Sequence, residues 1–107
     1  MATTITGSGP LKTVRVDLGA TAAKVEAITL PRWAREVEVS VYASDNTTAT
    51  AGTFSSSGTD GANPDAAAIR IDSAERKFFG FAPSESAVVI YVSGDVINAV
   101  AHIRVTS

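Results

Sequence analysis

Cysteine is absent from this chain of 107 residues, and histidine and tryptophan occur once each. Without cysteine there is no disulfide framework, no thiolate zinc site and no cysteine nucleophile. With a single imidazole, a metal site would have to rest on carboxylates, which suit calcium or magnesium better than transition metals. His102 falls on the outward face of the last predicted strand, where a solvated or interfacial role is commoner than catalysis. We therefore expect a protein that is not an enzyme and that uses no cofactor or metal.

A strong positive charge and a long apolar run are also missing. Nine basic residues stand against eleven acidic ones, for a net charge of −2, and the two kinds are interleaved along the chain. Nucleic-acid binding depends on a basic face that releases counterions. No apolar run approaches the roughly 20 residues of a membrane span, and residues 1–6 have neither the basic nor the apolar region of a secretory signal. We expect no nucleic-acid partner and no membrane partner.

Valine, isoleucine and alanine dominate the apolar share of 45%, while threonine and serine are prominent among the polar residues. This length suits one domain, and this share suits a folded one. β-Branched side chains are stiff at χ1 and pack well on a pleated surface. The composition therefore favours strands.

Alternation of apolar and polar residues predicts where the strands lie. Between residues 35 and 43, Val37, Val39 and Val41 alternate with polar residues, so a strand would place all three on its core face. Residues 13–18 alternate in the same way, and residues 97–105 would bury Ile97, Ala99, Ala101, Ile103 and Val105. Further strands are predicted at residues 24–30, 67–72, 77–82 and 87–93. The apolar run at 87–93 is typical of a central strand or of a subunit contact.

About seven or eight short strands without a convincing helix predict an all-β fold, an antiparallel β-sandwich or a jelly-roll-like small barrel. Residues 1–10, which end Gly7-Ser8-Gly9-Pro10, predict a flexible N-terminal arm before a single domain at 11–107. The arm is either a loose terminus or a segment that docks on a neighbour. A long loop is expected at about 44–66, interrupted by a short strand near 50–54. In that loop, residues 60–65 have oxygen ligands spaced unlike a calcium loop, so we expect a turn there.

Large apolar or aromatic side chains, and the histidine, are the candidates for contact with a partner. Trp33 is either a stacking group flanked by Arg32 and Arg35 or a plug at the edge of the core. Phe78 would point away from Phe79 and Phe81, out of the core. The full set of interface candidates is Ile5, Trp33, Phe54, Phe78, Tyr91 and His102.

A Gly/Ser-rich arm leads into Thr13-Val14-Arg15-Val16-Asp17, followed by the segment Ile28-Thr29-Leu30-Pro31-Arg32-Trp33-Ala34-Arg35-Glu36-Val37 and a final strand. In this pattern the chain resembles the small β-sandwich structural proteins of tailed-phage virions, capsid cement or decoration proteins among them. The resemblance implies a homo-oligomer, with a trimer favoured, that binds capsid or other virion subunits. It also implies a location in the virion, assembled in the host cytoplasm. A tail or fibre component would leave nearly the same composition.

A second function from another class is a carbohydrate-binding, lectin-like module. It would use Trp33, Tyr42 or Tyr91 as a platform on which a sugar ring stacks. An enzyme ranks third, and a hydrolase activity lost on His102→Ala would reveal it.

Overall fold

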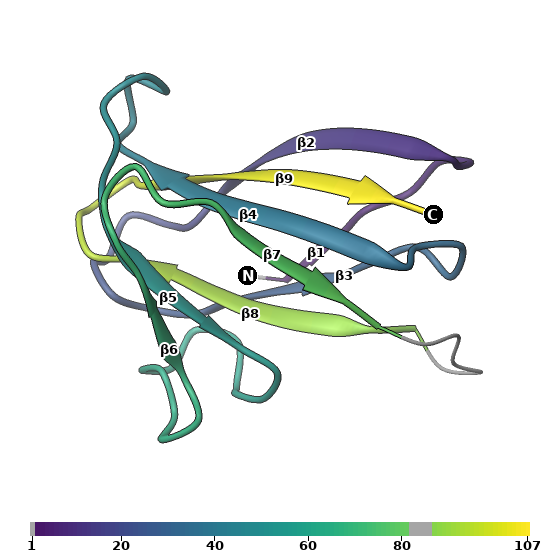
Figure 1. Cartoon of the computed structure of the whole chain (residues 1–107). Helices are drawn as coiled ribbons and strands as arrows, with labels where there is room; N and C mark the ends of the chain where they lie inside the picture. Colours follow the sequence, from purple (N-terminus) through teal and green to yellow (C-terminus); the bar gives the residue numbers. More distant parts are fainter. Residues whose placement is uncertain (1, 82–86) are drawn as a thin grey trace.

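The computed structural model describes residues 2–81 and 87–107. Within them the chain forms a β-sandwich of nine strands in two packed sheets (Figure 1). The strands are β1 (Thr3–Thr4), β2 (Leu11–Asp17), β3 (Glu26–Thr29), β4 (Glu36–Tyr42), β5 (Gly52–Ser55), β6 (Ile69–Ile71), β7 (Lys77–Gly80), β8 (Val89–Gly94) and β9 (Val100–Thr106).

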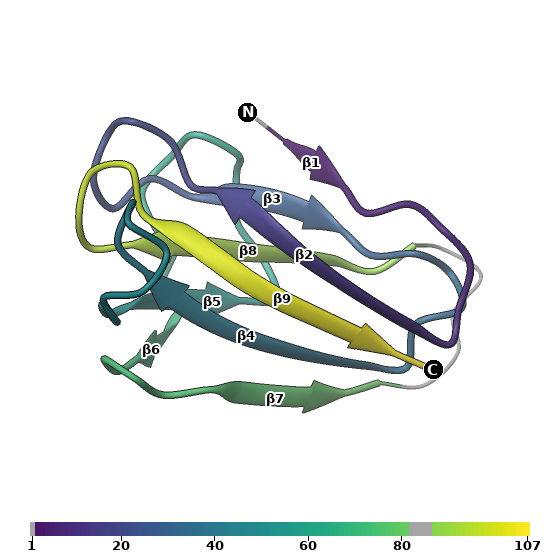
Figure 2. The ribbon, with the colours of Figure 1, turned by 90° about the horizontal axis from the view of Figure 1, so that it is seen from above.

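The five-stranded sheet has the order β1-β3-β8-β5-β6, and the four-stranded sheet has the order β2-β9-β4-β7. Figure 2 shows the four-stranded sheet from above, with β2 and β7 at its two edges. All described pairings are antiparallel except that of β1 with β3. The predicted sandwich is confirmed, and the jelly-roll-like barrel is wrong because the two sheets do not close on each other.

The core lies between the sheets and follows the alternation of β4. Val37, Val39 and Val41 are all fully buried, as predicted. They stand opposite Val105, Ile103 and Ala101 of β9, which face the same way. From the other sheet Ile28, Ile90 and Val92 complete the layer. Since directly opposite residues share a face, this register places the intervening polar residues of β4 and β9 on the outside.

Two side chains expected in the core are exposed instead. Ile97 was predicted to begin the last strand, but that strand begins at Val100, and Ile97 is 62% exposed. The chain turns first, with Asn98 in the left-handed region (φ 56°) and its amide bonded to the Gly19 carbonyl. Ile69, in the predicted strand 67–72, shares a face with the buried Ile71 but is exposed, because it lies at the start of the short edge strand β6. Ala82, the last residue of the predicted strand 77–82, lies outside the described residues.

The N-terminal arm differs from the prediction as well. Thr3 and Thr4 form an additional strand that was not predicted, β1, which pairs with Ile28 and Thr29 of β3. The Ile5 amide then bonds to the Thr29 carbonyl, and the Ile5 side chain is buried in the core. A free arm over the whole of residues 1–10 is therefore wrong. The physical reason is that Ile5 is the one large apolar residue among residues 2–10, and it packs into the core of the sandwich.

The long loop is divided as expected by a short strand, β5. After β5 the chain returns to the start of β3. There Val25 and Gly61 share a backbone contact, with the Gly61 amide bonded to the Val25 carbonyl and the Val25 amide to the Ala62 carbonyl. The Ala27 amide donates to Asp60 Oδ1 at 2.9 Å. The turn predicted at residues 60–65 is confirmed, and it is tied to the body of the sandwich rather than free of it.

Candidate functional site

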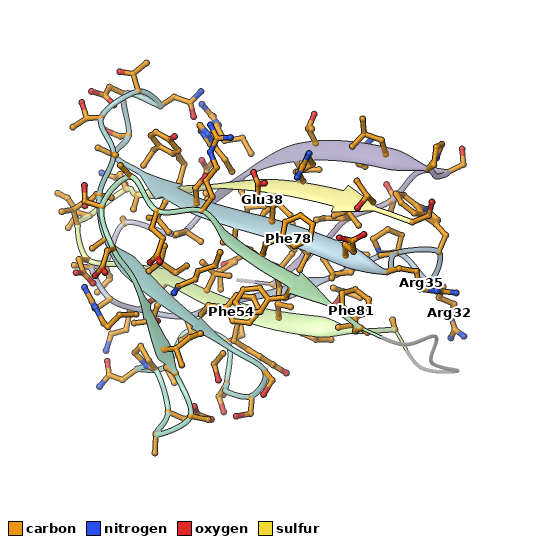
Figure 3. The ribbon with its side chains drawn as sticks, viewed as in Figure 1. Arg32, Arg35, Glu38, Phe54, Phe78 and Phe81 are labelled. Atoms are coloured by element: carbon orange, nitrogen blue, oxygen red, sulfur yellow. The ribbon has the colours of Figure 1, made fainter. Side chains whose placement is uncertain are left out.

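Two of the interface candidates, Ile5 and Phe54, are core residues in the structure of the single chain. Ile5 is 3% exposed, and Phe54 is buried as well. The Phe54 ring stacks on Phe79 with the ring centroids 3.9 Å apart. In Figure 3 Phe54 lies between the two layers, on the side opposite to Glu38. Alternation within β5 places Thr53 outside and Phe54 inside. A strand of four residues is too short for its sequence pattern to predict which side chains face the core.

Trp33 and Tyr91 are partly buried, and segments of this same chain lie against them. Trp33 packs on the core as the predicted plug, and its Nε1 donates to the Gly7 carbonyl at 2.9 Å. A Cβ at Gly9 would lie 3.0 Å from the indole ring, so the chain crosses close to Trp33. Gly58 approaches the Tyr91 ring in the same way, with its Cβ position at 3.4 Å. Neither aromatic therefore offers a fully open face to a ligand.

Phe78 and His102 lie together on the outer face of the four-stranded sheet. Phe78 points away from Phe79, as predicted, and is 53% exposed. Phe78 stands opposite Glu38, and Glu38 stands opposite Arg104 of β9. Arg104 Nη2 donates to Glu38 Oε2 at 2.8 Å, and the guanidinium carbon of Arg104 lies 5.8 Å from the centre of the Phe78 ring. This row joins an aromatic ring, a cation and a carboxylate across three strands.

The neighbouring row contains a hollow. Arg15 of β2 and Ser40 of β4 both stand opposite His102. Arg76 immediately precedes β7, whose first residue, Lys77, stands opposite Val39. Ser40 is short and buried, so the longer side chains around it border an open hollow of about 370 Å³. We call this space the arginine hollow. Its outward-facing lining is Thr13, Arg15, Glu38, Ser40, Tyr42, Arg76, His102 and Arg104.

Positive charge exceeds negative charge around the arginine hollow. Three guanidinium groups line it, and the carboxylate beside them, Glu38, is paired with Arg104. Arg15 has only a 3.8 Å contact with the exposed Asp17, an arrangement that contributes little in water. Arg76 makes no ion pair with any residue of 2–81 or 87–107. In a chain with a net charge of −2, this is a local basic surface.

His102 forms one end of the hollow and is held in place. Its ring stacks on Tyr42 with the centroids 4.2 Å apart, and its Nε2 bonds to Asn46 Oδ1. Burial, and secondarily the charge of Arg15, lowers the pKa of His102 below its ordinary value. The hydrogen-bond partner of His102 is an amide, and among the described residues no carboxylate orients the imidazole as in a catalytic histidine. The hollow is therefore suited to binding through cations, hydroxyls and stacked rings.

Across the described part of the chain, no three histidine, aspartate or glutamate side chains come together as a potential metal site. Asp60 and Asp65, which the sequence raised as possible ligands, accept hydrogen bonds from this chain's own amides and hydroxyls. Those bonds lower the pKa of both carboxyl groups, chiefly through the Ala27 amide at Asp60 and the Ser57 hydroxyl at Asp65.

Sequence reasoning missed Arg15, Arg76 and Arg104 as members of one site. The signal for each was present, since arginines at outward positions of alternating strands are visible in the sequence. What was not visible is that β2, β9, β4 and β7 are neighbours, because they come from distant parts of the chain.

Comparisons with protein-family models, with curated proteins and with solved structures found no match for this chain. Among the described residues there is no helix long and apolar enough to cross a membrane. Fold and site together define a class, a β-sandwich with a basic, aromatic hollow on one outer face.

Proposed function

We propose that the chain is a non-enzymatic structural protein of a tailed-phage virion, a capsid cement or decoration protein that binds the capsid lattice as an oligomer. A trimer is the favoured state. The sandwich fold and the resemblance of residues 13–17 and 28–37 to such proteins support the proposal. So does the thin inventory of catalytic groups, with one histidine and no cysteine.

The observation that carries the proposal is the exposed ring of Phe78 beside the Arg104–Glu38 pair. Aromatic residues and arginine are enriched at protein interfaces, where they supply most of the binding energy. A ring exposed by half on a sheet face is stabilised by a partner that covers it, and the exposed Leu11 lies on the same face. Phe78 is accordingly the residue on which we expect a neighbouring subunit to dock.

Light scattering behind a sizing column tests this proposal. We expect a closed oligomer whose mass does not change with concentration. Phe78→Ser should convert it to a monomer, whereas Ile97→Ser, which removes an exposed apolar residue from the turn between β8 and β9, should leave the mass unchanged. A wild-type chain that is monomeric at every concentration would count against the proposal.

A carbohydrate-binding module is the second candidate, and a specific observation favours it. Of the three aromatic residues proposed as sugar platforms, Tyr42 alone lines the arginine hollow, beside the hydroxyls of Thr13 and Ser40. A ring surface with a few convergent polar groups is the usual composition of a small-ligand site.

A further inference from the structure

The arginine hollow has a geometry that selects among ligands. Arg15, His102 and Ser40 occupy one row across β2, β9 and β4, and Arg76 closes that row from the side of β7. Strands in a sheet lie about 4.8 Å apart, so the backbones of Arg15 and Arg76 are separated by roughly three strand spacings. Both arginines line the hollow together with the short Ser40 between them. An anion that enters between them is met from both sides.

No group of the described chain fills that position. Glu38 is engaged by Arg104, and Asp17, the last residue of β2, does not line the hollow. Guanidinium groups bind carboxylates and phosphates through two parallel hydrogen bonds, which makes a paired arginine site suited to an anion with two acceptor oxygens. Arg76 has no ion-pair partner among residues 2–81 and 87–107, and Arg15 is weakly paired, so the two charges point to an anionic ligand that comes from outside.

The remaining lining indicates what carries the anion. Thr13 and Ser40 supply hydroxyls, and the stacked Tyr42 and His102 rings supply a flat apolar surface at one end. A space of about 370 Å³ is of the size that holds a small ligand rather than a folded surface. Hydroxyl groups, a flat ring and a carboxylate are what an acidic sugar presents together.

We propose that the arginine hollow binds an acidic saccharide, with its carboxylate between Arg15 and Arg76 and its sugar ring against Tyr42 and His102. The inference rests on the second candidate function, carbohydrate binding, and is independent of capsid docking.

Isothermal titration calorimetry on the full chain tests the proposal with trigalacturonate as the acidic probe and maltotriose as the neutral probe. We expect trigalacturonate to bind and maltotriose to bind at least tenfold more weakly. Arg76→Gln and Arg15→Gln should each weaken the binding of trigalacturonate by about tenfold or more, because each removes a charged hydrogen-bond donor. Arg32→Gln makes the same change of charge in the segment between β3 and β4, away from the hollow, and should leave the affinity unaltered.

Amide chemical shifts of Ser40 and His102 locate the bound sugar and show that each variant is folded. Equal affinity for maltotriose would overturn the acidic ligand while leaving carbohydrate binding in place. Absence of binding by both sugars would overturn the inference and the second candidate function together. A tetraglutamate peptide that binds as tightly as trigalacturonate would overturn the saccharide and assign the hollow to an acidic protein segment.

Discussion

Asp45 stands in the turn after β4, where its carboxylate gathers the donors of the next residues. Oδ1 accepts from the amides of Thr47 and Thr48 at 2.9 and 2.8 Å, and Oδ2 accepts from the Thr48 hydroxyl. These bonds favour the ionised form, so the pKa of Asp45 falls from 3.8 to about 2, with the Thr48 hydroxyl the largest cause. Asparagine and aspartate are common in turns for this reason.

Thr48→Val should raise the pKa of Asp45 from about 2 toward 3.8, because the largest stabilising contact of the carboxylate is lost. The measurement is an NMR titration of the Asp45 carboxyl carbon. Thr47→Val is the matched control, since the Thr47 hydroxyl contributes least, and it should shift the midpoint little. The lowered pKa of Asp45 also determines how the stability of the fold changes with pH. Asp45 stabilises the fold above pH 4, and this stabilisation is lost as the pH falls through about 2. A midpoint unmoved by Thr48→Val would show that the hydroxyl bond does not hold the carboxylate.

Gly52 is a second residue whose identity is set by one contact. It stands opposite Gly94 in the pairing of β5 with β8, and a Cβ at Gly52 would lie 2.1 Å from the Ser93 carbonyl oxygen. Since the obstacle is backbone of a central strand, it has little room to move.

We expect Gly52→Ala to destabilise the protein by roughly 1–3 kcal/mol or more, the range for overpacking a core. Chemical denaturation followed by tryptophan fluorescence gives the free energy of unfolding. Gly80→Ala is the control, because the nearest atom to its Cβ position, the Arg35 carbonyl oxygen, is 3.9 Å away. Equal losses in the two variants would mean that the close approach of β5 and β8 is not what requires glycine.

Each edge strand of the two described sheets is either short or carries a lysine on its inner face. β1 has two residues and β6 has three. On β2, Lys12 stands opposite Val105, and on β7, Lys77 stands opposite Val39; both valines face the core. Short edges and inward-facing charges are the devices that prevent pairing between molecules. Assembly of this protein is therefore expected to use a sheet face rather than a sheet edge.

Lys12→Val should remove the protection of β2 and produce larger, open-ended species whose size grows with concentration. Sedimentation velocity over a range of concentrations detects them. Lys12→Arg keeps the charge and should behave like the parent chain. If Lys12→Val sediments like the parent chain, the lysine does not guard the edge.

The elements also show how far the sequence predicts this fold. The strand around Val37, Val39 and Val41 was predictable because its side chains alternate over seven residues, β4 Glu36–Tyr42. β1 was not, because two residues carry no period and the strand exists only through its pairing with β3. Ile97 continues the alternation of the last strand in the sequence. In the structure, however, the chain turns at Asn98, and the strand begins only after this turn, at Val100. The local pattern therefore predicts long strands, whereas short ones depend on their neighbours.

The candidate site was predictable one residue at a time but not as a group. Phe78 and His102 were correctly placed on outward faces, while Arg15 and Arg76 had no signal that they meet. Their meeting depends on strand order, since among the described strands only β5 and β6 are consecutive in sequence and adjacent in one sheet. When neighbouring strands are far apart in the sequence, no local pattern of residues predicts that they are neighbours. The same crossing of the chain between sheets is what builds the hollow from four distant segments.

At the scale of the whole molecule, the N-terminal segment is part of the sandwich. It adds β1 to the five-stranded sheet, places Ile5 in the core and passes close to Trp33 before it enters β2 of the other sheet. Ile5→Ala should therefore cost about 2–5 kcal/mol of the free energy of unfolding, as for other buried isoleucines. Leu11→Ala truncates a side chain that is 56% exposed at the end of the same segment and should change stability by less than about 0.5 kcal/mol. Denaturant titration of both variants distinguishes a structural segment from a free arm. A stable Ile5→Ala variant would mean that the fold does not depend on this segment, whereas the expected loss shows that residues 2–6 belong to the sandwich of the single chain.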